Sequence, residues 1–360
     1  MLTVNSIPPS FISKFPSGIS VHGILAAFLT HGDPEDLQKY DLWKKVWPSR
    51  RDFEETMPIL WPECLRVRES HCNTKESTQR SFLPPSISGC WNTFCKQRSQ
   101  FPYESSHQNL LEDQEKRLQI AWNTVVAVFP NTDWETFSYH WLIVNTRSFY
   151  FLMPGQEPPE DRNDAMALLP FADYFNHSDL SCDVNFDGDF YVFRAAKCYN
   201  EGEEIYMSYG PHPNDFLFAE YGFFLDNNDS EAIYLDDIIF RDLNSSQQDE
   251  LHLHHYYGEY QVTATGVCFR TEIAACVKYM TRKDWQNYVL GHSTKGVNSV
   301  TTRKVIQAWI HTYTKEAETA VGTLRSCSER HMYPQKIEML LKRWAQIICV
   351  CVKAIDSISG

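Results

Sequence analysis

The stretch that decides the fold is Leu168–Phe224, which reads LLPFADYFNHSDLSCDVNFDGDFYVFRAAKCYNEGEEIYMSYGPHPNDFLFAEYGFF. Alternating apolar and polar residues in Asp189–Arg194 predict a half-buried strand. The corner Asn200–Gly202 then turns the chain into a second predicted strand, Glu204–Tyr209. A short apolar helix is predicted to follow over Asn214–Tyr221. The stretch therefore predicts one compact unit of strands, turns and a helix.

A polar turn and two aromatic residues of this stretch are candidates for a single binding site. Asn176 and His177 lie in a predicted turn, where side-chain and backbone groups can both reach a ligand. Tyr209 ends a predicted strand and Phe223 follows the predicted helix, so both can border the same cleft. Taken singly, such residues are more often core aromatics or hydrogen-bonded turn histidines. Their combination favours a site.

The order and spacing of three motifs resemble the C-terminal half of a SET domain. The motifs are FADYFNHS at 171–178, GEEIYMSYG at 202–210 and AEYGFFLDNN at 219–228. More narrowly, the chain is similar to the subclass typified by the Rubisco large-subunit methyltransferase, whose members act on ribosomal and other non-histone proteins. In that family the Asn-His pair and the Ser-Tyr-Gly strand pass each other in a pseudoknot. The pseudoknot binds S-adenosylmethionine on one side and a lysine channel on the other.

The resemblance implies a role for each matching residue. Asn176 and His177 would hold the amino-acid and adenine portions of S-adenosylmethionine, with Phe223 packed beside the adenine. Tyr209 is the expected catalytic residue, whose hydroxyl orients the substrate amine. Methyl transfer requires a neutral amine, although free lysine has a pKa of about 10.4. A narrow apolar channel disfavours the ammonium and aligns the lone pair with the methyl group.

Arg147 lies near the end of a strongly apolar helix predicted over Trp134–Phe151. A buried arginine usually needs a paired carboxylate, although a cation at a helix C-terminus also interacts with the helix dipole. The resemblance implies that Arg147 and Asp173 shape the substrate-lysine end of the channel. We therefore predict that the two side chains form an ion pair.

The resemblance also implies an α+β fold, in which a β-rich SET-domain pseudoknot core is split by a helical insert. We expect the SET domain over 1–240, with the insert at about 20–145 and the core at 146–226. A C-terminal helical domain at 241–360 would support the core and contact the protein substrate. Within the insert, 66–108 lacks a sustained hydrophobic period and is predicted to contain a loop insertion.

Helical spacing of apolar residues predicts several further helices. In chain order they are Val21–Thr30, a helix beginning after Pro48–Ser49, Asn109–Phe129, Ala274–Leu290, Thr302–Val321 and Lys336–Asp356. The three tryptophans within Trp43–Trp61 resemble a ligand box, but at this spacing they are predicted to pack helices instead.

Composition narrows the class of protein. A hydrophobic content of 43% with 14% aromatic residues indicates a folded chain. The net charge of −13 argues against bulk nucleic-acid binding and suits a basic protein substrate. The eleven cysteines are scattered without a C-x-x-C pair, which indicates a reducing compartment and no structural zinc or other metal site. No signal peptide or membrane-spanning run is evident, so a cytoplasmic or nuclear protein without membrane contact is expected.

This sequence resembles the family only from a point downstream of the family's first structural element. Family members open with a hairpin containing Gly-x-Gly, which contributes part of the cofactor pocket. The chain is therefore expected to be N-terminally truncated or to have a degenerate cofactor site. Three alternatives to an active lysine methyltransferase stay open: a SET-fold module that holds a protein partner without turnover, a protein-histidine methyltransferase, and an unrelated helical scaffold.

Overall fold

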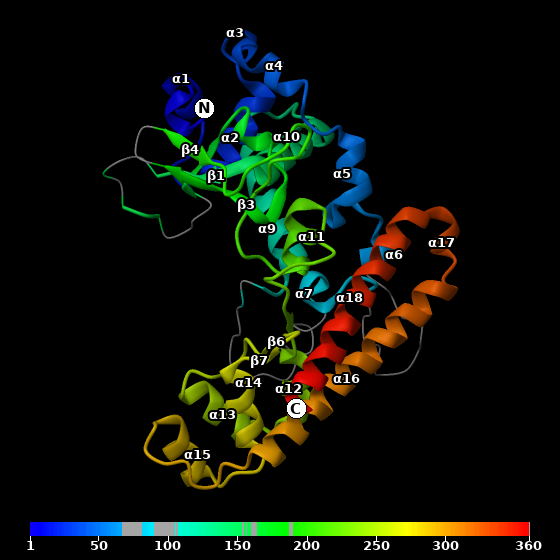
Figure 1. Cartoon of the computed structure of the whole chain (residues 1–360). Helices are drawn as coiled ribbons and strands as arrows, with labels where there is room; N and C mark the ends of the chain where they lie inside the picture. The colour runs from blue at the N-terminus through cyan, green and yellow to red at the C-terminus, as the bar shows by residue number, and fades with distance from the viewer. Residues whose placement is uncertain are drawn as a thin grey trace. The chain divides into compact units, whose positions relative to one another are not determined.

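The computed structural model divides into two compact units, which we describe separately (Figure 1). The first unit comprises Met1–Leu60, Asp113–His212 and Glu220–Leu225, and the second comprises Trp61–Glu112, Pro213–Ala219 and Asp226–Gly360. The described residues are 1–66, 81–89, 105, 107–152, 155, 157–159, 164–186 and 190–359. The predicted loop insertion at 66–108 lies largely outside them. The predicted domain boundary near residue 240 stays a prediction.

The first unit combines helices with two small antiparallel sheets. Its helices, counting those that lie mostly within it, are α1 (Pro9–Ile12), α2 (Val21–His31), α3 (Pro34–Leu37), α4 (Asp41–Lys44), α5 (Arg50–Thr56), α9 (Leu110–Val128) and α10 (Trp134–Arg147). Its strands are β1 (Ser148–Tyr150), β2 (Met166–Leu168), β3 (His177–Phe186) and β4 (Tyr191–Arg194). A short 3-10 helix, Ala172–Tyr174, connects β2 to β3. The mixed composition agrees with the predicted α+β class.

The second unit is mainly helical. Its elements are α6 (Glu63–Arg66), α7 (Pro85–Ser88), β5 (Ile233–Tyr234), α12 (Asp236–Asp242), α13 (Ser245–Leu253), β6 (Gln261–Thr263), β7 (Gly266–Val267), α14 (Phe269–Val277), α15 (Arg282–Val289), α16 (Ser299–Ser326), α17 (Glu329–Met332) and α18 (Pro334–Ser359). The two long helices, α16 and α18, pack side by side (Figure 1). No helix in the described part of the chain is both long and apolar enough to cross a membrane.

Helix α2 packs against α10 and forms the core of the first unit. The α2 helix begins after Ser20, whose hydroxyl accepts a hydrogen bond from the Gly23 amide, and it ends before Gly32. This confirms the helix predicted over Val21–Thr30. At the interface the His22 ring stacks on Trp141 with 4.3 Å between ring centroids. Its Nε2–H donates to the Trp141 carbonyl over 3.0 Å, so the buried ring is hydrogen-bonded.

Burial of His22 makes the stability of the chain depend on pH. Burial, with a smaller contribution from Arg117, lowers the pKa of His22 from 6.5 to about 3. The unfolded state therefore binds a proton that the folded state does not, and stability is lost as pH falls below about 6.5. From pH 7.5 to pH 5, His22 alone is expected to reduce the free energy of unfolding by about 2 kcal/mol. Urea unfolding at both pH values of wild type and His22→Gln tests this, because an unchanged pH dependence in the variant would contradict it.

Two predicted helices end differently from the prediction. The helix predicted over Trp134–Phe151 stops at Arg147, because Ser148 adopts an extended conformation and pairs with Leu168 of β2. The helix predicted over Ala274–Leu290 is two helices, α14 and α15, and the Thr281 hydroxyl caps the start of the second by accepting from the Asp284 amide. In both cases local backbone geometry interrupts a continuous apolar pattern.

Two sheets lie in the first unit. In the first sheet β1 pairs antiparallel with β2, and Leu2 forms a bridge to Leu168 at its edge. In the second sheet β3 pairs antiparallel with β4, with Phe186 opposite Tyr191. A third, three-stranded antiparallel sheet, β5-β6-β7, belongs to the second unit. The strand predicted over Asp189–Arg194 is thus present as β4.

The second predicted strand, Glu204–Tyr209, is not a ladder strand. Pairing occurs at Met207 alone, which forms parallel bridges to His177 and to Cys182. The Met207 amide donates to the Asn176 carbonyl over 2.8 Å, and the Cys182 amide donates to the Tyr206 carbonyl over 2.8 Å. These backbone hydrogen bonds go to two separated points, Asn176 just before β3 and Cys182 within it, so the chain here does not form a regular ladder. This crossing corresponds to the expected pseudoknot.

Candidate functional site

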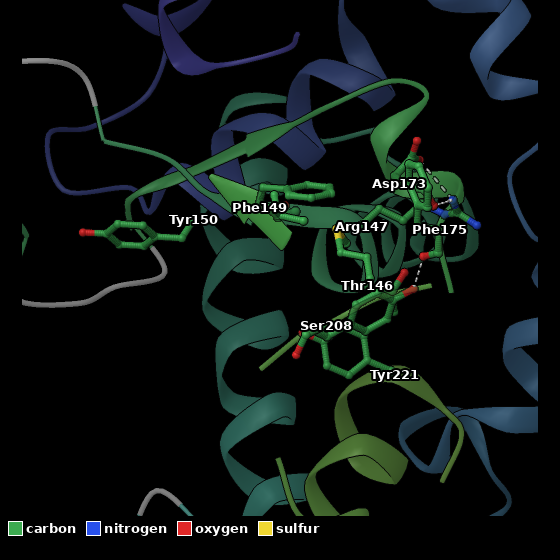
Figure 2. A pocket seen from close by; sticks show the side chains of 12 residues that line it. Thr146, Arg147, Phe149, Tyr150, Asp173, Phe175, Ser208 and Tyr221 are labelled. Atoms are coloured by element: carbon green, nitrogen blue, oxygen red, sulfur yellow. Dashed lines mark hydrogen bonds and ion pairs between the residues drawn. The ribbon is translucent and has the colours of Figure 1, made fainter. Parts of the chain in front are cut away.

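A cavity of about 170 Å³, here called the Tyr209 cavity, lies where α10 gives way to β1 (Figure 2). The residues that line it are Thr146, Arg147, Ser148, Phe149, Tyr150, Asp173, Phe175, Val184, Met207, Ser208, Tyr209 and Tyr221. They come from five segments of the chain, namely 146–150, 173–175, 184, 207–209 and 221. Three of the predicted site residues, Arg147, Asp173 and Tyr209, are among them.

Arg147 and Asp173 form the ion pair that the sequence predicted (Figure 2). The Arg147 Nη1 atom lies 3.0 Å from Asp173 Oδ2 and also donates to the Asp173 carbonyl oxygen over 3.0 Å. The Asp173 side chain is fully buried and that of Arg147 is 19% exposed. Opposite charges held together in this way offset much of the cost of removing each from water. The pair adds little net charge to the wall of the cavity.

Tyr209 places a neutral hydroxyl at the cavity. Its Oη–H donates to the Phe175 carbonyl oxygen over 2.7 Å. Burial raises the pKa of Tyr209 to about 12, against a smaller opposing contribution from Arg147. The hydroxyl is therefore protonated at physiological pH, and its oxygen lone pairs remain able to accept a hydrogen bond. It is suited to orienting an amine and unsuited to acting as a base.

His177 presents a hydrogen-bond donor from a buried position. Its Nδ1 accepts the Tyr209 backbone N–H over 3.0 Å, so the proton of the neutral ring must lie on Nε2. Burial lowers the pKa of His177, against smaller opposing contributions from the Met207 backbone and Asp179, and the ring is neutral at pH 7. Nε2 is buried and has no hydrogen-bond partner among the described residues. A buried donor without a partner is unfavourable, and a ligand can satisfy it.

The predicted cofactor residues gather around Tyr209. The His177 ring centroid lies 5.1 Å from that of Tyr209, and the Phe223 centroid lies 6.1 Å from both rings. Asn176 is exposed, and its Nδ2 donates to Glu204 Oε1 over 2.6 Å. Asn176 and His177 are thus adjacent to an aromatic cluster that ends at the cavity.

Among the unpredicted residues that line the cavity, two bear on the position of Tyr209. Tyr221, the last residue of α11 (Asn214–Tyr221), lines the cavity with its ring centroid 5.2 Å from that of Tyr209. Burial raises the pKa of Tyr221, so its hydroxyl is also neutral. Its position in the AEYGFF motif was the available signal. The Phe175 carbonyl, which holds the Tyr209 hydroxyl, is a backbone group and gives no signal in the sequence.

Comparison with protein families identifies the fold of this site. Residues 49–210 match the model of the SET domain. The chain contains a SET domain. Residues 231–356 match a second model, described as the ribosomal lysine N-methyltransferase 2 C-terminal domain. The SET-domain match includes every predicted site residue except Phe223.

Proteins similar in sequence to this chain include fungal and animal proteins. Ribosomal lysine N-methyltransferase set11 of Schizosaccharomyces pombe is 38% identical over 41% of this chain and 37% of its own length. Ribosomal lysine N-methyltransferase 2 of Saccharomyces cerevisiae is 29% identical over 68% and 54%. SET domain-containing protein 4 of Mus musculus is 27% identical over 82% and 65%. The chain thus spans between about a third and two thirds of the length of these relatives.

Solved structures with the same SET fold include Rubisco LSMT bound to AdoMet. It superposes with a TM-score of 0.52 at 13% identity, covering 95% of this chain and 76% of the other. The SET domain of LSMT bound to lysine and AdoHcy gives the same TM-score, identity and coverage. At this level of identity the likeness concerns the fold.

Proposed function

We propose that the chain is an S-adenosylmethionine-dependent protein-lysine N-methyltransferase that acts on a ribosomal protein. The observation that carries the proposal is that Tyr209 and the Arg147–Asp173 pair line one cavity of a SET domain, and that His177 is hydrogen-bonded to the Tyr209 backbone. Two relatives are named as ribosomal lysine N-methyltransferases, and the match at 231–356 is to the C-terminal domain of one of them. The proposal extends their activity to this chain.

The residues around His177 fit S-adenosylmethionine. The buried Nε2–H of His177 makes no hydrogen bond to the described residues. The carboxylate or an adenine nitrogen of the cofactor can accept a hydrogen bond from it. The Phe223 ring provides an apolar surface beside it, and Asn176 provides an exposed amide. When bound, S-adenosylmethionine supplies a methyl group on a positively charged sulfur. Asn176, His177 and Phe223 would hold it.

The Tyr209 cavity suits the neutral form of a lysine side chain. Partial removal from water in the cavity disfavours the ammonium, so the pKa of a lysine entering it should fall below its usual value of about 10.4. The paired charges of Arg147 and Asp173 leave no unbalanced carboxylate to retain the proton. The Tyr209 oxygen can then accept an N–H of the amine and fix the direction of its lone pair.

Removing the charge of Arg147 should shift the pH dependence of methyl transfer. In Arg147→Met the Asp173 carboxylate is unbalanced, which favours the lysine ammonium and raises the pKa of the bound amine. We expect the midpoint of the kcat profile, which reports groups in the enzyme–substrate complex, to rise by about one pH unit, with lower activity at pH 7.5. Arg51→Met is the matched control, because Arg51 is 83% exposed and forms only a surface pair with Glu55. A loss of activity with an unmoved profile would contradict this role.

The substrate is expected to be a basic protein. The chain carries a net charge of −13, which favours encounter with positively charged partners and not with nucleic acid. Ribosomal proteins are basic as a class, and they are made in the cytoplasm and assembled in part in the nucleus. We therefore propose that the enzyme acts in one of these compartments.

Two measurements test the proposed function. Isothermal titration with S-adenosylmethionine should give saturable binding to the full chain. Incubation with tritiated S-adenosylmethionine and salt-washed ribosomes should label one ribosomal protein, and hydrolysis should recover the label as methyllysine. Binding without transfer would favour an interaction module, and label in methylhistidine would favour the histidine-directed alternative. Absence of cofactor binding would refute the proposal.

A further inference from the structure

The indole of Trp43, in the predicted helical insert, contacts Asp173, one of the residues that line the Tyr209 cavity. Trp43 lies in α4, is 4% exposed, and its Nε1–H donates to Asp173 Oδ2 over 2.7 Å. Its ring packs edge-on against Tyr40 and Trp47. The prediction that this tryptophan only packs helices is therefore incomplete, since it also makes a buried hydrogen bond to a charged group lining the cavity.

The carboxylate that Trp43 binds is central to the turn beside the cavity. Asp173 Oδ2 accepts from both Trp43 and Arg147, while Asp173 Oδ1 has no partner among the described residues. Asp173 precedes by two residues the Phe175 carbonyl that holds the Tyr209 hydroxyl. It precedes Asn176 by three. The orientation of the Asp173 carboxylate therefore affects the position of the turn that carries the Phe175 carbonyl and Asn176.

This turn needs side-chain support because its backbone is strained. Phe171, which begins it, has φ of +81°, a conformation that costs a non-glycine residue on the order of 1 kcal/mol or more. Phe171 is 69% exposed, and its ring contacts are with Tyr174 and Phe175 of the same turn. The two hydrogen bonds to Asp173 Oδ2 hold the turn from its buried side. Loss of either should loosen it.

Trp47 provides an internal contrast with Trp43. The two rings meet edge to face, with centroids 4.8 Å apart and planes at 89°. The Trp47 Nε1 atom is also buried, but it has no hydrogen-bond partner among the described residues. Both side chains thus belong to one aromatic cluster, and what distinguishes Trp43 is its hydrogen bond to Asp173.

We propose that Trp43 is a positioning residue of the methyltransferase site. Its indole N–H fixes the Asp173 carboxylate, and through it the Arg147 guanidinium and the turn leading to Asn176. This inference rests on the proposed function as far as substrate binding is concerned. The positioning of the turn is a property of the fold alone, and the two parts are tested separately.

The first test measures substrate binding with L-lysine as the probe in the presence of S-adenosylhomocysteine. In Trp43→Phe the Kd for L-lysine should rise about tenfold, because a hydrogen bond to a charged group is lost from the wall of the cavity. Trp47→Phe removes an indole that donates to none of the described residues and should change this Kd less than about twofold. Equal effects of the two substitutions would reduce Trp43 to a packing residue and overturn the proposal. An unchanged Kd in Trp43→Phe would do the same.

The second test measures amide hydrogen exchange in 172–178 and 207–209, and it needs no ligand. Trp43→Phe should speed exchange in both segments at least about tenfold, whereas Trp47→Phe should not. If Trp43→Phe does not fold, benzothienylalanine at position 43 keeps the ring shape and lacks only the N–H. Unchanged exchange would overturn the positioning role. A wild-type chain that binds neither S-adenosylhomocysteine nor lysine would refute the proposed function, while the exchange result would still decide the role of Trp43 in the fold.

Discussion

Tyr209→Phe is expected to lower kcat for methyl transfer by about 10²-fold or more, with the Kd for S-adenosylmethionine unchanged within about twofold. The substitution removes one oxygen and keeps the ring that packs on His177. Without the hydroxyl, the amine in the cavity loses the acceptor that fixes its lone pair, and the Phe175 carbonyl loses its donor. Single-turnover rates with tritiated S-adenosylmethionine and a labelled ribosomal protein measure the effect.

Tyr174→Phe is the matched control for this experiment. Tyr174 lies in the same short 3-10 helix as Asp173 and is 45% exposed, so loss of its hydroxyl should leave kcat unchanged. Tyr221→Phe tests the alternative that Tyr221 orients the amine, because Tyr221 also lines the cavity. If Tyr209→Phe retained full activity while Tyr221→Phe abolished it, the orienting role would belong to Tyr221.

Arg343→Ala is expected to lower the free energy of unfolding by about 3–5 kcal/mol. Arg343 lies in α18 with a fully buried side chain, and it donates to Asp215 over 2.7 Å and to Glu231 over 2.8 Å. Its removal leaves two buried carboxylates without a counter-charge. Burial already raises the pKa of Glu231 in the intact chain, and loss of the guanidinium would raise it further. Urea denaturation at pH 7 measures the change.

The adjacent residue provides the control for Arg343. Lys342 also forms an ion pair, with Asp226, but both side chains are more than half exposed. Lys342→Ala should therefore cost less than about 1 kcal/mol. The triple variant Arg343→Met, Asp215→Asn and Glu231→Gln tests whether unbalanced buried charge causes the destabilisation. Removing all three charges should recover part of the free energy of unfolding that Arg343→Ala loses. Equal destabilisation by Arg343→Ala and Lys342→Ala would contradict this account of the buried cluster.

Much of the helical structure was predictable because its signals are local. The Val21–Thr30 pattern gives α2, and the Ser49 hydroxyl with Asp52 forms the capping box that begins α5. The predictions failed where a backbone change interrupts an apolar run, as at Ser148 and Thr281. Apolar spacing reports which face is buried, and it does not report where a helix stops.

The pairing of Arg147 with Asp173 was predictable, whereas the hydrogen bond of Trp43 to the same carboxylate was not. A buried cation implies a counter-charge, and the resemblance indicated which carboxylate it would be. Nothing in Trp43 distinguishes it from Trp47, which lies four residues further along the chain. Only the fold brings one indole N–H to Asp173 and leaves the other without a partner among the described residues.

The sequence by itself determined the resemblance to a SET domain and the set of candidate residues, because the three motifs in Leu168–Phe224 are specific in order and spacing. The tertiary structure decided how these residues are used. It placed the His177 proton on Nε2, tied the Tyr209 hydroxyl to the Phe175 carbonyl, and added Tyr221 to the cavity. These features depend on which backbone group faces which side chain across distant segments. Local sequence does not specify such contacts. They form only when distant segments of the chain come together, as Met207 does with His177 and Cys182.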